Sequence, residues 1–279
     1  MNFRKLIGVI LILVTSLSLL SAMGNKDGVK PVGMKKFDIK NMEYEKFVTY
    51  IGDEVKNYSY VVYIISSDGK VMDQYMDTYN VSGPFTKLPS KLDDFANHYV
   101  IDLENFTLLR AVEDSSIRNI AEKKHGTFYE EYNFDYANLK VDYIAKSWDG
   151  NETKIQKSRM KLNKGFSYSI GNTIPTFLRM IDTTRPGVFY FAMPQFIKDP
   201  LPVYATVIAK EEITTPMKKF QTVKIKWAVT DTFMSFLYNN YMDSINIWID
   251  TETGKWVQYQ DKSQGLRTEL IETGIWTDK

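Results

Sequence analysis

Apolar and polar residues alternate with a period of two along most of the chain, which is the pattern of half-buried β-strands. The clearest case lies at residues 139–147, where Leu139, Val141 and Tyr143 face one way and Lys140 faces the other. Such a strand belongs to an antiparallel sheet with one solvated face. About a dozen segments of this kind recur at roughly ten-residue spacing, which predicts an antiparallel sandwich or barrel.

Turn signals join these segments into hairpins. Residues 58–65 and 71–81 are rich in aromatic and β-branched side chains, and they flank Asp68-Gly69. Asp-Gly between two such runs is one of the strongest short-range hairpin signals. The first run is apolar on both faces, so we expect both of its faces to be covered.

One segment keeps helical periodicity instead. Residues 173–181 begin with Thr173, a candidate cap, and Pro175 lies in the first turn. Apolar residues then recur at the i, i+3, i+4 and i+7 positions of one helical face, namely Ile174, Phe177, Leu178 and Ile181. A shorter helix is expected within residues 88–96, and residues 233–241 are ambiguous between strand and helix.

The first 24 residues resemble a secretory signal peptide. Arg4 and Lys5 precede an apolar run at residues 6–20, and small residues follow at positions 21–24. A run of about 15 apolar residues is shorter than the roughly 20 that span a bilayer. We expect a signal peptide at residues 1–24 without a lipoprotein cysteine; the alternative is an uncleaved N-terminal anchor.

The remaining residues form a tether and a single domain in this interpretation. Residues 25–36 are polar with Gly, Pro and Lys, which favours a flexible tether. Residues 37–279 are long enough to bury a core without disulfides, and we expect them to form a single antiparallel β domain. The chain contains no Cys, so this core must supply the stability.

Composition and charge narrow the function classes. Without Arg4 and Lys5, the totals of 35 basic and 34 acidic residues leave a formal charge of −1. A nucleic-acid binder normally gathers a basic excess on one face, so we expect no nucleic-acid partner. The absence of Cys excludes thiolate catalysis, and neither His98 nor His125 has metal-ligand spacing. We expect no metal and no cofactor.

Catalytic motifs are absent from the sequence. It contains no G-x-S-x-G, P-loop, G-x-G-x-x-G or H-E-x-x-H pattern. The adjacent carboxylates Glu130-Glu131 and Glu211-Glu212 point to opposite faces of their strands, so neither pair shares a cleft without a bulge. Residues 250–254 begin like a calcium loop but lack the later ligands, so a hairpin turn is expected. We expect a protein that is not an enzyme, with a hydrolase acting on envelope material as the lesser alternative.

Aromatic residues make up 14% of the chain, and several of the largest gather in its C-terminal half. One interpretation is an ordinary β core, because large aromatics at period two pack sheet against sheet. The other is a curved sheet closed by the helix at residues 173–181, which leaves an apolar cavity for an acyl chain or a similar ligand. On the second interpretation, the residues that line the cavity are Phe177, Phe189, Phe191, Trp227 and Trp248.

Several C-terminal motifs carry a family resemblance. Residues 211–225 (EEITTPMKKFQTVKI) are similar to the E-x-x-x-T-P-x-G-x-F-x-T-x-K hairpin of DUF3108, a bacterial domain of unknown function. Residues 244–250 (SINIWID) resemble its x-I-W-I-D strand, and residues 264–270 (QGLRTEL) resemble its closing strand. Residues 175–179 (PTFLR) fall where that family has its short helix, and the resemblance covers about residues 127–271.

The resemblance has implications for fold and location. It implies export to the periplasm and an antiparallel sheet wrapped around a helix. It also implies a likeness in shape to the LolA and LolB lipoprotein carriers, whose concave sheets hold acyl chains. Lys218 stands where the family usually has Gly, so this hairpin turn must be of a type that needs no positive φ.

The fold class that follows is mainly β, with an antiparallel curved sheet or incomplete β-barrel and one short helix packed on the concave side. We expect an exported, non-catalytic periplasmic protein of the cell envelope that binds a hydrophobic or lipid-like ligand in the concave sheet. After leader cleavage it is not expected to be an integral membrane protein. The alternative is a structural or protein-interaction module that binds an envelope protein partner through its sheet edges or an exposed aromatic patch.

Overall fold

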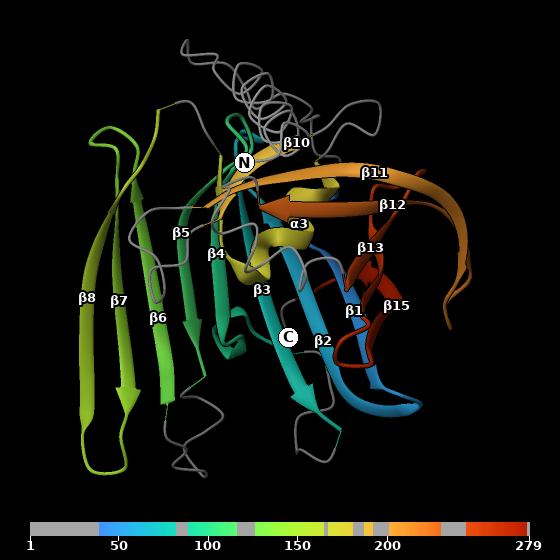
Figure 1. Ribbon diagram of the computed structural model, residues 1–279, viewed down its shortest axis with the longest axis horizontal. Helices are drawn as coiled ribbons and strands as arrows, with labels where there is room; N and C mark the ends of the chain where they lie inside the picture. Colours follow the sequence, from blue (N-terminus) through green and yellow to red (C-terminus); the bar gives the residue numbers. More distant parts are fainter. Residues whose placement is uncertain are drawn as a thin grey trace, which may run out of the picture.

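The protein folds into one large curved sheet (Figure 1). The computed structural model describes residues 39–81, 89–115, 126–164, 167–180, 187–191, 201–229 and 244–277. Within them, 15 strands pair in the order β8-β7-β6-β5-β4-β3-β2-β1-β15-β14-β13-β12-β11-β10-β9. All the described neighbours are antiparallel except β9 and β10. The prediction of a mainly β, antiparallel, open sheet with one short helix is confirmed.

The sheet has two arms that meet at its middle. The first arm contains β1 (Glu43–Ile51), β2 (Glu54–Ile65), β3 (Val71–Asn80), β4 (Asn97–Asp102), β5 (Thr107–Asp114), β6 (Gly126–Asp135), β7 (Lys140–Trp148) and β8 (Thr153–Lys161). The second contains β9 (Tyr168–Ser169), β10 (Gly187–Phe191), β11 (Leu201–Thr214), β12 (Lys219–Val229), β13 (Ile245–Asp250), β14 (Trp256–Asp261) and β15 (Leu266–Ile275). The arms join where β1 pairs with β15, so the first and last strands are neighbours.

The helical segment lies where the chain passes from one arm to the other. This crossing contains the 3-10 turn η2 (Gly171–Thr173) and the helix α3 (Ile174–Arg179), both inside the curve of the sheet (Figure 1). We call the face that carries α3 the concave face and the opposite one the convex face. Pro175 lies in the first turn of α3, and the predicted apolar residues Ile174, Phe177 and Leu178 are buried. Of the other predicted helix, the described part contains only the 3-10 turn η1 (Leu92–Asp94).

The main core lies on the concave face. One continuous cluster of buried side chains joins α3 to inward-facing residues of both arms. In β12, Val223, Ile225 and Trp227 belong to this cluster, which is the face that their alternation predicts. The strand register and the core therefore have the same period of two.

Strand β2 is covered on both faces, as its apolar run predicts. Val61 and Tyr63 belong to the concave cluster, while Tyr60 and Val62 belong to a second cluster on the convex face. The C-terminal Trp276 packs into that second cluster, and its indole Nε1 donates a hydrogen bond to the carbonyl oxygen of Pro89 at 3.0 Å.

Two predicted hairpin turns are confirmed. Gly69, between β2 and β3, has a φ of 70°, a conformation that glycine adopts without strain. In the turn between β11 and β12, the amide of Thr215 donates to the carbonyl oxygen of Lys218 at 3.0 Å. Lys218 is not among the described residues with positive φ, so this turn needs no glycine there.

Strand β9, at the edge of the second arm, contacts β5 of the first arm through hydrogen bonds that do not form a strand ladder. The amide of Tyr168 in β9 donates to Oγ1 of Thr107 in β5 at 3.2 Å, and Oγ of Ser167 donates to the carbonyl oxygen of Asn105 at 3.3 Å. Strands β6, β7 and β8 continue past this contact as the outermost strands of the first arm (Figure 1).

Four predictions fall outside the described residues. These are the leader and tether at residues 1–36, the last helical residue Ile181, the ambiguous segment at residues 233–241, and His125.

Candidate functional site

The structure brings together two of the five aromatic residues predicted to line a ligand site. Phe177 of α3 is 0% exposed, Trp227 of β12 is 7% exposed, and both belong to the concave cluster. Phe189 and Phe191 lie in β10, but their side chains lie outside the described part of the structure. Trp248 lies apart from Phe177 and Trp227, on the convex face.

Strand alternation explains the position of Trp248. In β13, Ile247 and Ile249 point into the concave cluster, so the residue between them points the other way. There the indole Nε1 of Trp248 donates to Oε2 of Glu211 at 2.8 Å, and Nζ of Lys224 lies 5.0 Å from the ring centroid. This Trp is thus packed among charged side chains.

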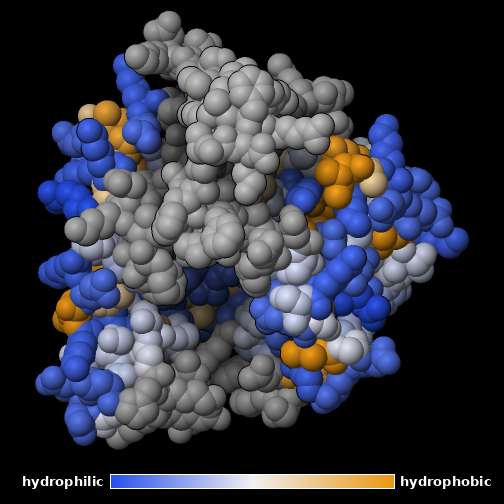
Figure 2. Space-filling model, in the orientation of Figure 1, coloured by the Kyte–Doolittle hydropathy of each residue, from blue (hydrophilic) through white to orange (hydrophobic). Residues whose placement is uncertain are grey.

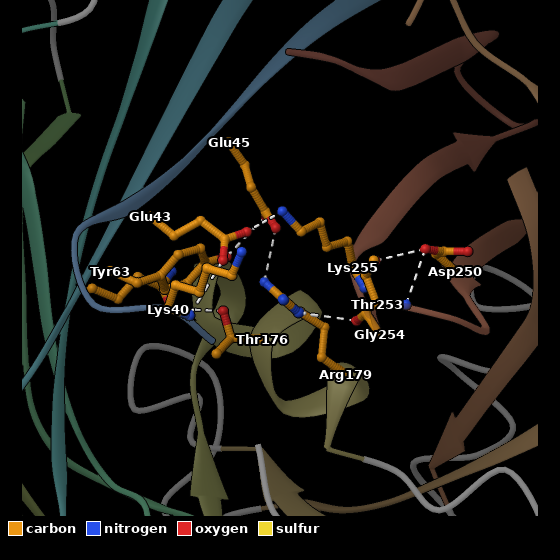
Figure 3. Close-up of polar contacts among 11 residues, drawn as sticks. Lys40, Glu43, Glu45, Tyr63, Thr176, Arg179, Asp250, Thr253, Gly254 and Lys255 are labelled. Carbon is orange, nitrogen blue, oxygen red and sulfur yellow. Dashed lines mark hydrogen bonds and ion pairs between the residues drawn. The ribbon is translucent and has the colours of Figure 1, made fainter. Parts of the chain in front are cut away.

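A buried ion pair fixes α3 to the concave face (Figure 3). Nη1 of Arg179, at the end of α3, donates to Oε1 of Glu45 in β1 at 2.9 Å. Nε of Arg179 also donates to the carbonyl oxygen of Gly254 at 2.9 Å, and the hydroxyl of Tyr63 donates to Oε2 of Glu45 at 3.1 Å. The side chains of Arg179 and Glu45 are only 2% and 0% exposed.

Further polar contacts widen this network across both arms. Lys255, in the turn between β13 and β14, forms an ion pair with Glu43 of β1, which also accepts a hydrogen bond from the amide of Lys40 at 3.3 Å. Oγ1 of Thr176 in α3 donates to Oε1 of Gln74 in β3 at 2.6 Å. The helix is therefore held by β1, β3 and the turn of the second arm (Figure 3).

Burial and mutual attraction set the charges of the network. Burial raises the pKa of the Glu45 carboxyl, and the charges of Arg179 and Lys255 oppose that shift. Burial disfavours the charged form of Arg179, but Glu45, Tyr63 and Glu43 together outweigh it, so the pKa of Arg179 is raised. Burial and the Glu45 charge raise the pKa of Tyr63, which keeps its hydroxyl protonated as a donor. The charged and polar groups of the network are paired with one another. This arrangement fits an anchor for α3 better than a reactive centre.

The concave face also carries a second cluster of polar side chains, which the sequence pattern does not predict. Glu113 of β5 and Glu130 of β6 are direct cross-strand partners. Oε1 of Glu113 accepts hydrogen bonds from the Tyr99 hydroxyl at 2.8 Å and from Nδ2 of Asn172 at 2.9 Å. Oε1 of Glu130 accepts one from the Tyr143 hydroxyl at 2.7 Å. Two carboxylates and their donors thus form a polar patch beside the apolar cluster.

Glu131, next to Glu130 in β6, has the orientation that strand alternation predicts. Glu131 points to the opposite face from Glu130 and pairs there with Nη2 of Arg110 at 2.9 Å. The two adjacent glutamates therefore do not share a cleft. The sequence carried no local signal for the Glu113–Glu130 pair, because it depends on the register between two separate strands.

We expect the substitution Glu113→Gln to change how stability depends on pH. Burial, together with the Glu130 charge, raises the pKa of Glu113 above its ordinary 4.5. A carboxyl with a raised folded pKa stabilises the fold below its unfolded pKa, and this contribution is lost as pH rises through the folded pKa. The stability of Glu113→Gln relative to the unchanged protein should therefore increase from pH 4 to pH 7, as measured by urea unfolding.

Glu131→Gln is the matched control for this experiment. Despite some burial, hydrogen bonds from Tyr129 and Arg110 lower the pKa of Glu131. The relative stability of Glu131→Gln should therefore decrease over the same pH range. If both variants shift in the same direction, the pH dependence does not arise from these carboxyls.

Other candidate chemistry is accounted for by local contacts. Asp250 accepts hydrogen bonds from the amide of Thr253 at 3.1 Å and from its Oγ1 at 2.6 Å, in a hairpin turn between β13 and β14. The hairpin predicted at residues 250–254 is thus confirmed. Nε2 of His98 lies 2.7 Å from Oδ1 of Asp73, and its ring stacks on Tyr75 with centroids 4.4 Å apart.

The described residues contain no group of three or more His, Cys, Asp or Glu side chains that could hold a metal ion. No helix within the described ranges is long and apolar enough to cross a membrane.

Comparison with known proteins adds little beyond these observations. No protein-family model matches the sequence, and no curated protein matches it either. The DUF3108 resemblance therefore stays a prediction.

Two solved structures show a weak likeness to the chain. One is a proposed exported protein with a YmcC-like fold from Bacteroides fragilis, with 8% identity and a TM-score of 0.31, over 86% of this chain and 99% of that one. The other is a proposed lipoprotein from Parabacteroides distasonis, with 12% identity and a TM-score of 0.30, over 86% and 99% of the respective chains. TM-scores of this size carry no inference about fold or function.

Proposed function

We propose that the protein is an exported, non-catalytic protein of the bacterial envelope that binds a hydrophobic or lipid-like ligand on the concave face of its sheet. Export rests on the signal-peptide pattern of residues 1–24. The ligand rests on one observation, the continuous apolar cluster that runs through both arms of an open sheet. Of the described chain, only η2 and the six-residue α3 form a helical cover over it.

The polar groups beside the cluster suit an amphiphilic ligand. Ligand sites are mostly apolar, with a few polar groups that fix the orientation of the ligand. Glu113 and Glu130, with the tyrosine hydroxyls that donate to them, are polar groups of this kind on the concave face. A ligand with an apolar chain and a hydroxyl or amine end fits such a surface.

A pair of tryptophans offers a test with an internal control. Trp227 and Trp248 are similarly buried, at 7% and 5%, but they face opposite sides of the same sheet. We expect Trp227→Phe to weaken binding of the fluorescent apolar amine N-phenyl-1-naphthylamine about fivefold, because about 1 kcal/mol of apolar contact is lost. Trp248→Phe should leave the dissociation constant unchanged within about twofold, as measured by fluorescence titration.

The dissociation constants are compared under conditions in which both variants are equally folded. Urea unfolding of each variant measures its folded fraction. Equal weakening by the two substitutions, or no saturable binding by the unchanged protein, would contradict the proposal. Native mass spectrometry of the protein purified from envelope extracts gives an independent check, because a lipid carrier should retain a bound acyl species.

The complete burial of Phe177 favours a second candidate function. With Phe177 at 0% exposure inside the concave cluster, its ring is out of reach of solvent, as expected where protein side chains fill the space beneath α3. A filled core suits a structural or interaction module that binds an envelope protein partner rather than a lipid. A ligand-free mass with no recovered lipid would support this function, and crosslinking would then identify the partner.

A further inference from the structure

The convex face of β7 and β8 is strongly basic. The nine residues of β8 contain no acidic residue and four basic ones, namely Lys154, Lys157, Arg159 and Lys161, of which all but Lys154 have the phase of the convex face. The chain as a whole carries a formal charge of only +1, so this is a local concentration of positive charge. Strand β8 is also an edge of the sheet, because β7 is its only partner among the described strands.

The register determines which side chains share the convex face. Tyr143 of β7 and Met160 of β8 belong to the concave cluster, so the residues that alternate with them point to the convex side. The basic residues on this convex side are Lys140, Lys146, Lys157, Arg159 and Lys161. On these two strands they share the face with a single acidic residue, Asp142.

Part of this charge has no counter-charge in the described structure. Asp142 pairs with Arg159 at 2.6 Å and with Lys140 at 3.4 Å. Lys157 and Lys161 are exposed and have no ion-pair partner within the described ranges. Their charge is therefore available to an anionic partner.

An exposed apolar side chain lies among these charges. Ile155 is 61% exposed and is the cross-strand neighbour of Lys146, while Ile144 pairs with Lys157. Lysine on an edge strand commonly prevents association with another strand. That role does not account for the basic residues on the face of β7 or for a largely exposed Ile155 on the same face.

We propose that the convex face of β7 and β8 binds the surface of an anionic lipid membrane. Basic side chains gain attraction to anionic headgroups, and exposed apolar side chains enter the boundary between headgroups and acyl chains. Lys157 and Lys161 supply the first contribution and Ile155 the second. In Figure 1, β7 and β8 are the outermost strands at the left of the molecule, and in Figure 2 that margin is mostly hydrophilic with separate hydrophobic residues. The proposal is independent of any ligand on the concave face.

Charge reversal tests the electrostatic contribution. The full chain is mixed with vesicles of phosphatidylglycerol and phosphatidylethanolamine, or of phosphatidylcholine alone, and binding is measured by flotation. We expect the double variant Lys157→Glu, Lys161→Glu to partition onto the anionic vesicles at least about tenfold more weakly, because each basic residue near such a surface contributes appreciably. The same charge change at the hairpin of β11 and β12, Lys218→Glu with Lys219→Glu, is the matched control and should change partitioning less than about twofold.

A second pair of variants separates a lipid surface from other anionic partners. Ile155→Ser should weaken vesicle binding about threefold, while Ile208→Ser, at a site 51% exposed in β11, should not. Thermal unfolding confirms that all variants fold, and residues 1–24 are identical in every variant, so differences between variants arise from the substituted sites. Equal binding to phosphatidylcholine vesicles would overturn the proposal. So would binding of polyglutamate or duplex DNA at equal affinity without dependence on Ile155, which would indicate a general polyanion surface.

Discussion

Arg179→Met should lower the free energy of unfolding by about 3–5 kcal/mol, because it leaves a buried carboxylate without its charged partner. Glu45 is 0% exposed and accepts a hydrogen bond from Arg179 at 2.9 Å. Methionine keeps an unbranched apolar stem, so little packing is lost with the guanidinium. The measurement is urea unfolding at neutral pH, followed by circular dichroism.

Two further variants show whether the loss arises from the unpaired charge. The double variant Arg179→Met, Glu45→Met should recover most of the stability, because apolar replacement of a buried pair is often neutral or stabilising. Lys219→Met breaks an exposed pair with Glu212, whose side chains are 71% and 46% exposed, and should cost less than about 1 kcal/mol. If Arg179→Met costs no more than this control, the buried pair is not what holds α3.

The anchor explains how so short a helix persists. An isolated six-residue helix is unstable in water, because nucleation fixes several residues for very few hydrogen bonds. In this protein α3 is tied to β1 through Glu45, to β3 through Gln74, and to the second arm through Gly254. Each arm contributes a contact, so the helix also joins the two arms across the inside of the curve.

Local patterns predicted the local structure well. The hairpin of β2 and β3 follows from two strand-like runs around Asp68-Gly69, and the buried face of α3 follows from apolar residues at helical spacing. Both signals are contained in fewer than about 25 consecutive residues. They depend only on residues close together along the chain, so one sequence is enough to detect them.

Contacts between distant segments could not be predicted in the same way. Glu45 and Arg179 are 134 residues apart, and nothing near either residue names its partner. The sequence does indicate that Glu45 is buried, because it alternates with Phe47 and so places a carboxyl on an apolar face. Such a residue needs a buried partner, but only the crossing of the chain inside the sheet determines which one.

The candidate ligand site shows a different limit. Trp227 and Trp248 are predicted to line one site because both are large aromatics in the C-terminal half of the chain, yet they occupy opposite faces of the sheet. The period of two in β13 was available in the sequence, since Ile245, Ile247 and Ile249 fix the inward phase. Grouping aromatics by phase within each strand would have separated Trp248 from the others.

Phe177→Ala should also lower the free energy of unfolding by about 3–5 kcal/mol, because it removes a completely buried ring from the core. The side chain lies in the concave cluster, where the α3 anchors limit how far the helix can move to fill the space. Phe177→Leu retains most of the volume and should cost less than about 1.5 kcal/mol. Urea unfolding of the two variants measures both losses.

The same two variants distinguish a filled core from a ligand face. If Phe177 serves only the core, binding of N-phenyl-1-naphthylamine should decrease in proportion to the unfolded fraction, and fully folded Phe177→Leu should bind as the unchanged protein does. If a ligand contacts the face beneath α3, Phe177→Leu should bind more weakly by about threefold while remaining folded. A stability loss below about 1 kcal/mol for Phe177→Ala would show that the concave cluster relaxes around the missing ring, and that α3 is less firmly anchored than its contacts indicate.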